Sequence, residues 1–149
     1  MKYKKAELKP DEIACLELLG LYEQYGYQKY KMSKFEEYSL YVENKEFLAG
    51  DKVITFTDLD GRLLALKPDV TLSIIKNTTA TADCSEKLYY IENVYRESRE
   101  RQTFQEVNQM GLEYLGEVDQ YAVTEVIALA VKSLQAISRD FILAVSHMD

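Results

Sequence analysis

The segment KVITFTDLDGRLLALKP, residues 52–68, places the strongest constraint on how this chain can fold. Residues 53–57 alternate with a period of two, which is typical of a β-strand. Asp60 and Gly61 then supply residues that tolerate a positive φ, and an apolar run returns at 63–66. The pattern predicts a β-hairpin, so part of the fold is an antiparallel sheet.

The N-terminal region predicts an amphipathic helix over residues 10–25. Proline occupies its first turn beside two acidic residues, and both features favour a helix start. Ile13, Leu16 and the Leu19–Gly20 pair then recur at helical spacing and predict its apolar side. Gly26 marks the expected end of the helix.

Shorter elements follow this helix. A short strand is expected over residues 27–32, followed by irregular or short helical structure. After the hairpin, Pro68 stands where a second helix could begin. We expect Val70, Ile74 and Ile75 on one side of that helix.

Two long strands and a long helix are expected in the second half of the chain. A polar linker, 78–86, precedes strands at 87–97 and 104–116, which a charged turn joins. Asp119 is expected to cap a helix over 120–138, with core positions at helical spacing. These positions are Val123, Val126 or Ile127, Ala130 and Leu134.

The chain closes with the apolar run FILAVSHM, residues 141–148, which is typical of a buried strand. The order helix, hairpin, helix, two strands, helix, strand predicts an α+β domain with a largely antiparallel sheet flanked by helices. A core strand usually needs a following element to cover it. We therefore expect residues 1–149 to be the N-terminal part of a longer core domain.

Composition limits the functions that the chain can have. Its net charge of −7 argues against broad binding to nucleic acid, which needs a basic face. No apolar run approaches the roughly 20 residues that span a bilayer, and no apolar stretch follows the first lysines, so a cytoplasmic protein is expected. Cys15 and Cys84 lack metal-ligand spacing and His147 is the one histidine, so neither a His/Cys metal site nor a Ser/His/Asp triad is expected.

Polar side chains gather on one face if the two long strands pair. Residues of equal parity share a face, so Gln109 and Glu113 point the same way, with open space expected above Gly111 between them. Arg96 lies on the other strand near the turn. This set suits a small zwitterion, with Arg96 for a carboxylate or phosphate and Glu113 for an ammonium group.

Simpler roles remain open for the same residues. Polar residues that alternate along an antiparallel strand are typical of a solvated face. Asp69 and Thr71 could join the polar set from a helix start, although capping that helix is the usual role of such residues. The charged turn at 98–103 is typical of a solvated surface. The tyrosines at 89, 90, 95 and 114 favour sheet packing over base stacking.

Three segments, ITFTDLDGRLLALKPDVT, KLYYIENVYRE and QEVNQMGLEYLG, occur in an order that resembles the class II core of histidyl-tRNA synthetases and of their paralogue, the regulatory subunit of ATP phosphoribosyltransferase. In that family the hairpin leads into an RPE-T or RPD-T signature, here residues 67–71. Motif 2 begins with an arginine after an aromatic, here Tyr95 and Arg96, and its return strand carries Q-G-E, here at 109–113. By this resemblance the histidine-binding positions are Asp69, Thr71, Arg96, Gln109 and Glu113.

Several ATP contacts of the synthetases are missing from the same motifs. The motif 2 glutamate position is Ser98, with Glu97 one place early, and the turn at 98–103 lacks the family's proline and glycine. Val107 replaces the aromatic that stacks on adenine, which removes a contribution of about 1 kcal/mol or more. Ser33 stands at the motif 1 proline. The changes affect ATP contacts and spare the amino-acid contacts.

The resemblance therefore implies a regulatory subunit of ATP phosphoribosyltransferase, in the first step of histidine biosynthesis, with no catalytic residues or cofactor of its own. It implies histidine as ligand, the catalytic ATP phosphoribosyltransferase subunit as partner, and a homodimer through the motif 1 region near residues 10–25. Asp69 favours this paralogue, because the synthetases prefer glutamate there. The alternatives are a divergent histidyl-tRNA synthetase, which activates histidine with ATP and charges tRNA, and a stand-alone histidine-binding or structural module.

Overall fold

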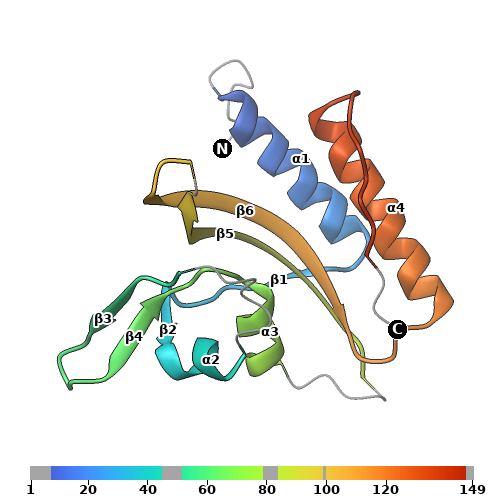
Figure 1. Cartoon of the computed structure of the whole chain (residues 1–149). Helices are drawn as coiled ribbons and strands as arrows, with labels where there is room; N and C mark the ends of the chain where they lie inside the picture. The colour runs from blue at the N-terminus through green and yellow to red at the C-terminus, as the bar shows by residue number, and fades with distance from the viewer. Residues whose placement is uncertain (1–7, 45–51, 79–83, 99, 147–149) are drawn as a thin grey trace. The chain divides into compact units, whose positions relative to one another are not determined.

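The computed structural model describes residues 8–44, 52–78, 84–98 and 100–146 and confirms the predicted α+β class (Figure 1). The helices in these ranges are α1 (Pro10–Gln24), α2 (Tyr38–Glu43), α3 (Thr71–Asn77) and α4 (Gln120–Ile137). The strands are β1 (Gln28–Lys29), β2 (Phe35–Glu37), β3 (Thr55–Thr57), β4 (Leu63–Leu66), β5 (Glu86–Ser98) and β6 (Thr103–Leu115). No helix within the described ranges has the length and apolar character needed to cross a membrane.

Two sheets carry the fold. The predicted hairpin is confirmed as β3 and β4, and β2 extends it into an antiparallel sheet of order β2-β4-β3. Gly61 in the hairpin turn has a φ of 81°, as the sequence predicts. The second sheet has the order β1-β5-β6. Residues 99–102 alone join the neighbours β5 and β6, a connection that is short enough only for antiparallel strands.

The chain divides into two compact units, and both long strands contribute to each of them. Unit 1 comprises residues 1–28, 80–89 and 112–149, and unit 2 comprises residues 29–79 and 90–111. Helices α1 and α4 belong to unit 1, whereas α2, α3 and the β2-β4-β3 sheet belong to unit 2. Each unit has buried residues of its own.

Unit 2 packs α2 and α3 against one face of its small sheet. Ala65 on the central strand points toward these helices and is fully buried, whereas its neighbours on β4 face the opposite way. That opposite face carries Phe35 and Phe56, whose rings meet edge to face at 5.3 Å and stay partly exposed. The core cluster consists of Leu40, Tyr41, Ala65 and Leu72.

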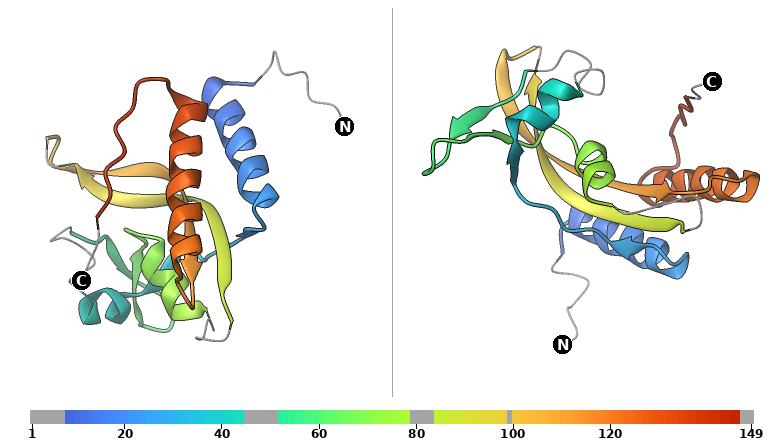
Figure 2. Two further views of the ribbon diagram at one scale, coloured as in Figure 1. Left: turned by 90° about the vertical axis from the view of Figure 1, so that its right-hand side faces the viewer. Right: turned by 90° about the horizontal axis from the view of Figure 1, so that it is seen from below.

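Unit 1 is built on the packing of α1 against α4 (Figure 2). Asp119 caps α4 as predicted, since its carboxylate accepts a hydrogen bond from the Ala122 backbone N–H at 2.7 Å. The hydroxyls of Tyr22 and Ser133 are 2.9 Å apart, and the Tyr22 ring lies 5.8 Å from that of Tyr89 on β5. Burial raises the pKa of Tyr22.

A charged pair with a buried carboxylate lies inside unit 1. Lys87 of β5 lies 2.7 Å from Glu125 of α4, and the Tyr27 hydroxyl donates to the same carboxylate oxygen at 3.2 Å. The Lys87 ammonium also lies over the rings of Tyr27 and Tyr114, at 5.5 and 5.7 Å from their centroids. Burial and then the charge of Glu125 raise the pKa of Tyr27. The pair therefore connects α4 to β5, and both of its charged groups have a further contact with a tyrosine.

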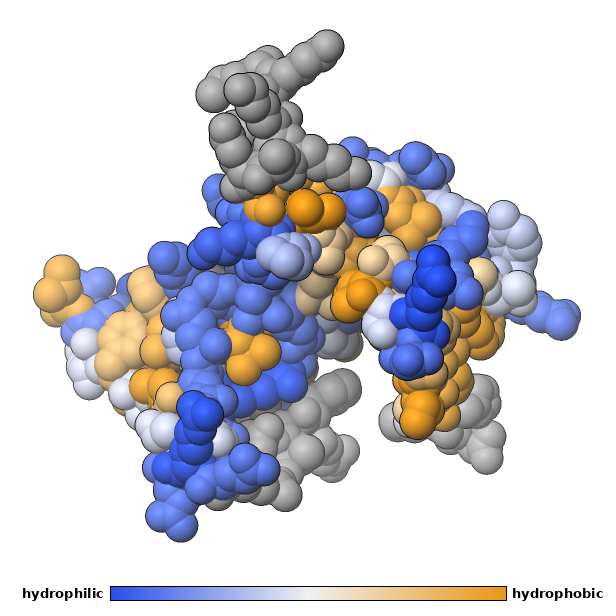
Figure 3. Space-filling view, turned by 90° about the horizontal axis from the view of Figure 1, so that it is seen from above, coloured by the Kyte–Doolittle hydropathy of each residue, from blue (hydrophilic) through white to orange (hydrophobic). Residues whose placement is uncertain are grey.

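The predicted apolar faces of both long helices are correct only in part, because Ala130 and Leu134 are partly buried but other predicted positions are exposed. In α1 the buried residues are Leu18 and Tyr22, whereas Leu16 is 56% exposed. In α4 the predicted core residue Val123 is 46% exposed, because the face that carries Glu125 turns inward to Lys87. Apolar side chains consequently lie at the surface beside polar ones (Figure 3). The buried residues of α4 are Ala122, Glu125 and Leu129.

The region around residues 27–43 agrees with its prediction only in part. The strand expected over 27–32 is reduced to Gln28–Lys29, and the short helix expected after it is α2. Val70 just before α3 and Ile74 within it are buried as expected, but Ile75 is 45% exposed. Short elements of this kind have too few residues for periodicity to fix their bounds or their faces.

The buried strand expected over residues 141–148 is wrong for the residues that can be judged. Residues 141–146 form neither strand nor helix, and Ile142 is 92% exposed. A strand needs a neighbour for its backbone groups, and no described strand pairs with this segment. His147 and residues 79–83 of the predicted linker lie outside the described residues.

Candidate functional site

Arg96, near the end of β5, is held by three polar groups of unit 2. Its Nε donates to the Pro68 carbonyl at 2.9 Å. Its Nη2 donates to Gln109 Oε1 at 2.9 Å and lies 3.4 Å from Asp69 Oδ2. The Arg96 side chain is still 41% exposed, and within the described residues its Nη1 has no hydrogen-bond partner. The structure therefore brings together three of the predicted residues around a guanidinium that solvent reaches.

Asp69 lies in the turn before α3 and makes two interactions. Its Oδ1 accepts a hydrogen bond from the Leu72 backbone N–H at 3.3 Å, while its Oδ2 faces Arg96. Both roles that the sequence left open, capping the helix and joining the polar set, are therefore present. Burial raises the pKa of the nearby Tyr41 phenol, and the charges of Glu36 and Asp69 raise it further.

Gln109 on β6 makes its second contact with Tyr90 of β5. The Gln109 Nε2 donates to the Tyr90 hydroxyl at 2.9 Å. The open space expected above Gly111 is a wrong prediction, because a Cβ at that glycine would lie only 2.5 Å from the Tyr90 hydroxyl oxygen. A protein side chain thus fills this space. Sequence reasoning missed Tyr90, although its even number places it on the same face as Arg96.

Thr71 and Glu113 complete the predicted set. Thr71 is the first residue of α3, in unit 2, and is partly buried. Glu113 is partly buried and lies in the part of β6 that belongs to unit 1. The assignment of either residue to a ligand stays a prediction, as does that of the other three.

A buried ion pair, Lys67 with Glu92, fixes the turn that leads to Asp69. The Lys67 side chain is 2% exposed and its ammonium donates to the Glu92 carboxylate. The Lys67 carbonyl accepts from the Tyr95 backbone N–H at 2.9 Å, which ties the same turn to β5. Sequence reasoning missed this pair, because a lysine is normally expected at the surface.

The positions of the expected ATP contacts are also occupied differently. The Ser98 hydroxyl accepts from the Arg101 backbone N–H at 3.3 Å, so it stabilises the turn. Glu97 forms an ion pair with Lys52 at 2.7 Å. Val107 is 42% exposed and presents no flat ring. This part of unit 2 therefore shows neither a carboxylate at position 98 nor a stacking surface at position 107.

The chemistry that this arrangement supports is the binding of an anionic group. Partners already engage Nε and Nη2 of Arg96, and Nη1 can still donate charge-assisted hydrogen bonds to a carboxylate. Across the described ranges, no group of three or more His, Cys, Asp or Glu side chains could hold a metal ion. The geometry points to recognition of a small charged molecule.

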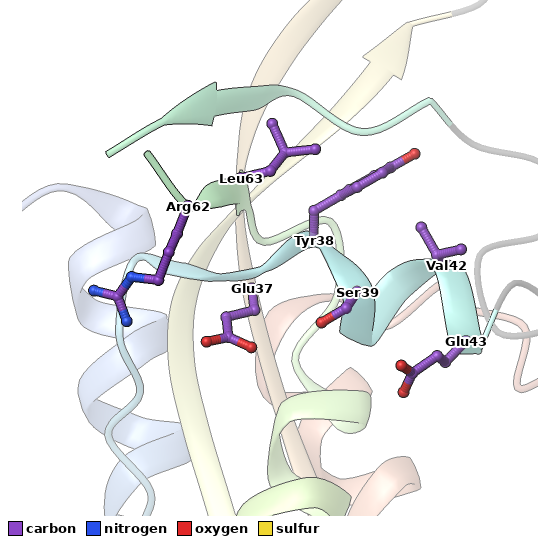
Figure 4. Close-up of a pocket in the computed structure, with 7 residues that line it drawn as sticks. All are labelled: Glu37, Tyr38, Ser39, Val42, Glu43, Arg62 and Leu63. Atoms are coloured by element: carbon purple, nitrogen blue, oxygen red, sulfur yellow. The ribbon is translucent and has the colours of Figure 1, made fainter. Parts of the chain in front are cut away.

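A separate hollow of about 490 Å³ lies between α2 and the start of β4 in unit 2 (Figure 4). Tyr38 and Val42 of α2 and Leu63 of β4 give it an apolar lining, and Arg62 and two glutamates stand at its edges. None of the five predicted residues is among those that line it. This hollow is therefore distinct from the polar set around Arg96.

Known proteins of similar sequence include histidine–tRNA ligases and ATP phosphoribosyltransferase regulatory subunits. A histidine–tRNA ligase from Dictyoglomus turgidum is 31% identical over 144 residues, which cover 88% of this chain and 35% of that protein. An ATP phosphoribosyltransferase regulatory subunit from Desulfitobacterium hafniense is 31% identical over 151 residues, which cover 95% of this chain and 38% of that protein. The chain thus spans little more than a third of the length of these curated relatives.

The fold is similar to that of a chain in a solved ATP phosphoribosyl transferase (HisG:HisZ) complex from Thermotoga maritima. The TM-score is 0.62 at 17% identity, over 91% of this chain and 43% of that chain. A protein-family model described as histidyl-tRNA synthetase matches residues 4–149. The class II synthetase-like core and the family resemblance are thus both confirmed, and the chain belongs to the histidyl-tRNA synthetase family, in which ligases and ATP phosphoribosyltransferase regulatory subunits are comparably similar to it.

Proposed function

We propose that this chain is the N-terminal portion of a regulatory subunit of ATP phosphoribosyltransferase that binds histidine without activating it. Relatives of both kinds are 31% identical to it, so similarity does not choose between them. The observation that carries the proposal is a contrast inside motif 2. Arg96 remains held for a carboxylate, while Ser98 and Val107 stand where the family's ATP contacts are expected.

Histidine binds through its two charged groups in this proposal. Its carboxylate accepts from Nη1 of Arg96, whose guanidinium Gln109 and Asp69 already hold in place, so little order is lost on binding. We propose Glu113 as the partner of its ammonium group and Thr71 as a further ligand contact. Each charge-assisted contact of this kind contributes roughly 1.5–3 kcal/mol.

ATP binds poorly in this proposal, because the contacts at two positions are lost together. A serine hydroxyl cannot replace the charge of a carboxylate, and Glu97 is already paired with Lys52. The aromatic stacking that Val107 cannot provide contributes about 1–3 kcal/mol per base. Adenylation of histidine is therefore absent, although the amino acid is still bound.

A regulatory subunit acts through partners. We propose that this protein assembles in the cytoplasm with a catalytic ATP phosphoribosyltransferase subunit and transmits feedback by histidine in the first step of histidine biosynthesis. The Desulfitobacterium relative is an ATP phosphoribosyltransferase regulatory subunit, and the Thermotoga chain of similar fold comes from an ATP phosphoribosyl transferase complex, which supports this partner. We further propose a homodimer through α1 and the segment after it, where Leu16 is 56% exposed.

The decisive experiment compares two activities of the full-length protein. We expect no histidine-dependent exchange of pyrophosphate with ATP, and we expect the protein to restore activity to a short catalytic ATP phosphoribosyltransferase and to make it sensitive to histidine. Pyrophosphate exchange would instead identify a histidyl-tRNA synthetase. If neither activity appeared, a stand-alone histidine-binding module would be the better description.

The ligand is tested separately by calorimetry of histidine with the full-length protein. We expect Glu113→Ala to weaken binding by roughly 1.5–3 kcal/mol, the size of a charge-assisted contact. The exposed Glu117 provides a matched control, because Glu117→Ala removes the same charge from the loop after β6. Equal affinities for both variants would remove Glu113 from the site.

A further inference from the structure

Tyr90 occupies the space directly above Gly111. A Cβ on Gly111 would lie 2.5 Å from the Tyr90 hydroxyl oxygen and 2.7 Å from its Cζ. The φ of Gly111 is not positive, so its backbone does not require glycine. A larger residue at position 111 would instead occupy the space that the Tyr90 ring fills.

The Tyr90 hydroxyl also decides which way the Gln109 amide points. A guanidinium can only donate hydrogen bonds, so Arg96 must meet the amide oxygen, as it does at 2.9 Å. The amide nitrogen then needs an acceptor on its other side, and the Tyr90 oxygen lies there at 2.9 Å. If the amide turned over, its NH2 group would face the donors of Arg96. Tyr90 therefore excludes the wrong orientation of Gln109.

We infer that Tyr90 is a positioning residue of this site, which fixes the Gln109 amide and through it holds the Arg96 guanidinium for a ligand carboxylate. Gly111 contributes to this positioning, because its lack of a side chain leaves space for the Tyr90 ring. The inference rests on the proposed function in one respect, that the carboxylate belongs to histidine. It goes beyond the proposed function by adding a residue that need not touch the ligand.

A structural role and a positioning role predict different results for Tyr90→Phe. Tyr90 is 4% exposed, and phenylalanine keeps the buried ring while removing the hydroxyl that accepts from the Gln109 amide. Packing alone would leave ligand binding unchanged. Positioning of Arg96 would weaken a ligand that carries a carboxylate and spare one that lacks it.

The first measurement is calorimetry on the full-length protein with histidine and with histidinol, which lacks the carboxylate. We expect Tyr90→Phe to weaken histidine binding about fivefold, the effect of one hydrogen bond, and to leave histidinol binding unchanged. Tyr95→Phe is the matched control, because Tyr95 lies on the same strand with odd parity and thus on its other face. An equal change for both ligands, or no change for histidine, would overturn the inference.

The second measurement needs no ligand. In ¹⁵N-resolved NMR spectra of the full-length protein, we expect Tyr90→Phe to shift the Gln109 side-chain amide signal and to speed hydrogen exchange at Arg96 Nε. Gly111→Ala, which displaces the ring, should have the same two effects. If wild-type protein binds no histidine, the proposed ligand is wrong, whereas unchanged Gln109 and Arg96 signals in Tyr90→Phe show that the positioning role is wrong.

Discussion

Replacing Glu92 and replacing Lys67, the two partners of one ion pair, should lower the unfolding free energy by unequal amounts. The Lys67 side chain is 2% exposed and that of Glu92 is 17% exposed. Glu92→Met leaves an ammonium group with almost no access to water, which costs about 3–5 kcal/mol of unfolding free energy. Lys67→Met leaves a carboxylate that water still reaches in part, so we expect about 1–3 kcal/mol. The double replacement leaves no buried charge and should be close to neutral.

Urea unfolding of the full-length protein, followed by circular dichroism, measures these differences. Lys52→Met serves as a control, because the Lys52–Glu97 pair has a short 2.7 Å contact but a lysine that is 73% exposed. Its loss should cost about 0–1 kcal/mol. The reasoning is refuted if Lys67→Met costs as much as Glu92→Met, or if the double variant loses the sum of the two single effects.

Three further predictions concern other polar groups. In the Lys87–Glu125 pair the carboxylate is the deeper partner, 6% exposed against 28%, so Lys87→Met should destabilise the protein more than Glu125→Met in urea unfolding. The Tyr41 hydroxyl is buried with no hydrogen-bond partner among the described residues, so Tyr41→Phe should raise the unfolding free energy by about 1 kcal/mol, and a loss on thermal denaturation would reveal a partner. The Arg62 backbone N–H lowers the pKa of Asp58, so this carboxylate stabilises the hairpin turn above its ordinary pKa of 3.8 and loses that effect as the pH falls through the lowered folded value. NMR titration of Asp58 should show a midpoint below 3.8.

The elements that could be predicted are those whose signals are local. Asp60 and Gly61 specify a turn by their backbone preferences alone, and the hairpin forms as expected. Asp119 specifies a helix start through its own side chain, and α4 begins after it. The turn between the two long strands is also a local signal, and their expected pairing brings Arg96 of one strand to Gln109 of the other.

The features that could not be predicted depend on partners far away in the sequence. The inward face of α4 follows Glu125, whose partner Lys87 lies 38 residues earlier, so helical periodicity could not identify it. The burial of Lys67 depends on Glu92, 25 residues later. The sequence favours sheet packing for Tyr90, because no residue near it in the sequence indicates that the Gln109 amide needs an acceptor. The 141–146 run is apolar, but apolar character alone supplies no partner for its backbone.

The two units are interleaved along the chain, and this has a consequence for synthesis on the ribosome. Residues 29–79 and 90–111 of unit 2 lie between the segments of unit 1. Tyr22 of α1 meets Ser133 of α4 across 111 positions. Every residue of unit 2 therefore leaves the ribosome before α4 does, and until α4 emerges the contact of Tyr22 with Ser133 cannot form. The unit that carries Arg96 and Gln109 can therefore fold before α1 meets α4, and the uncovered face of α1 is open to chaperones in the interval.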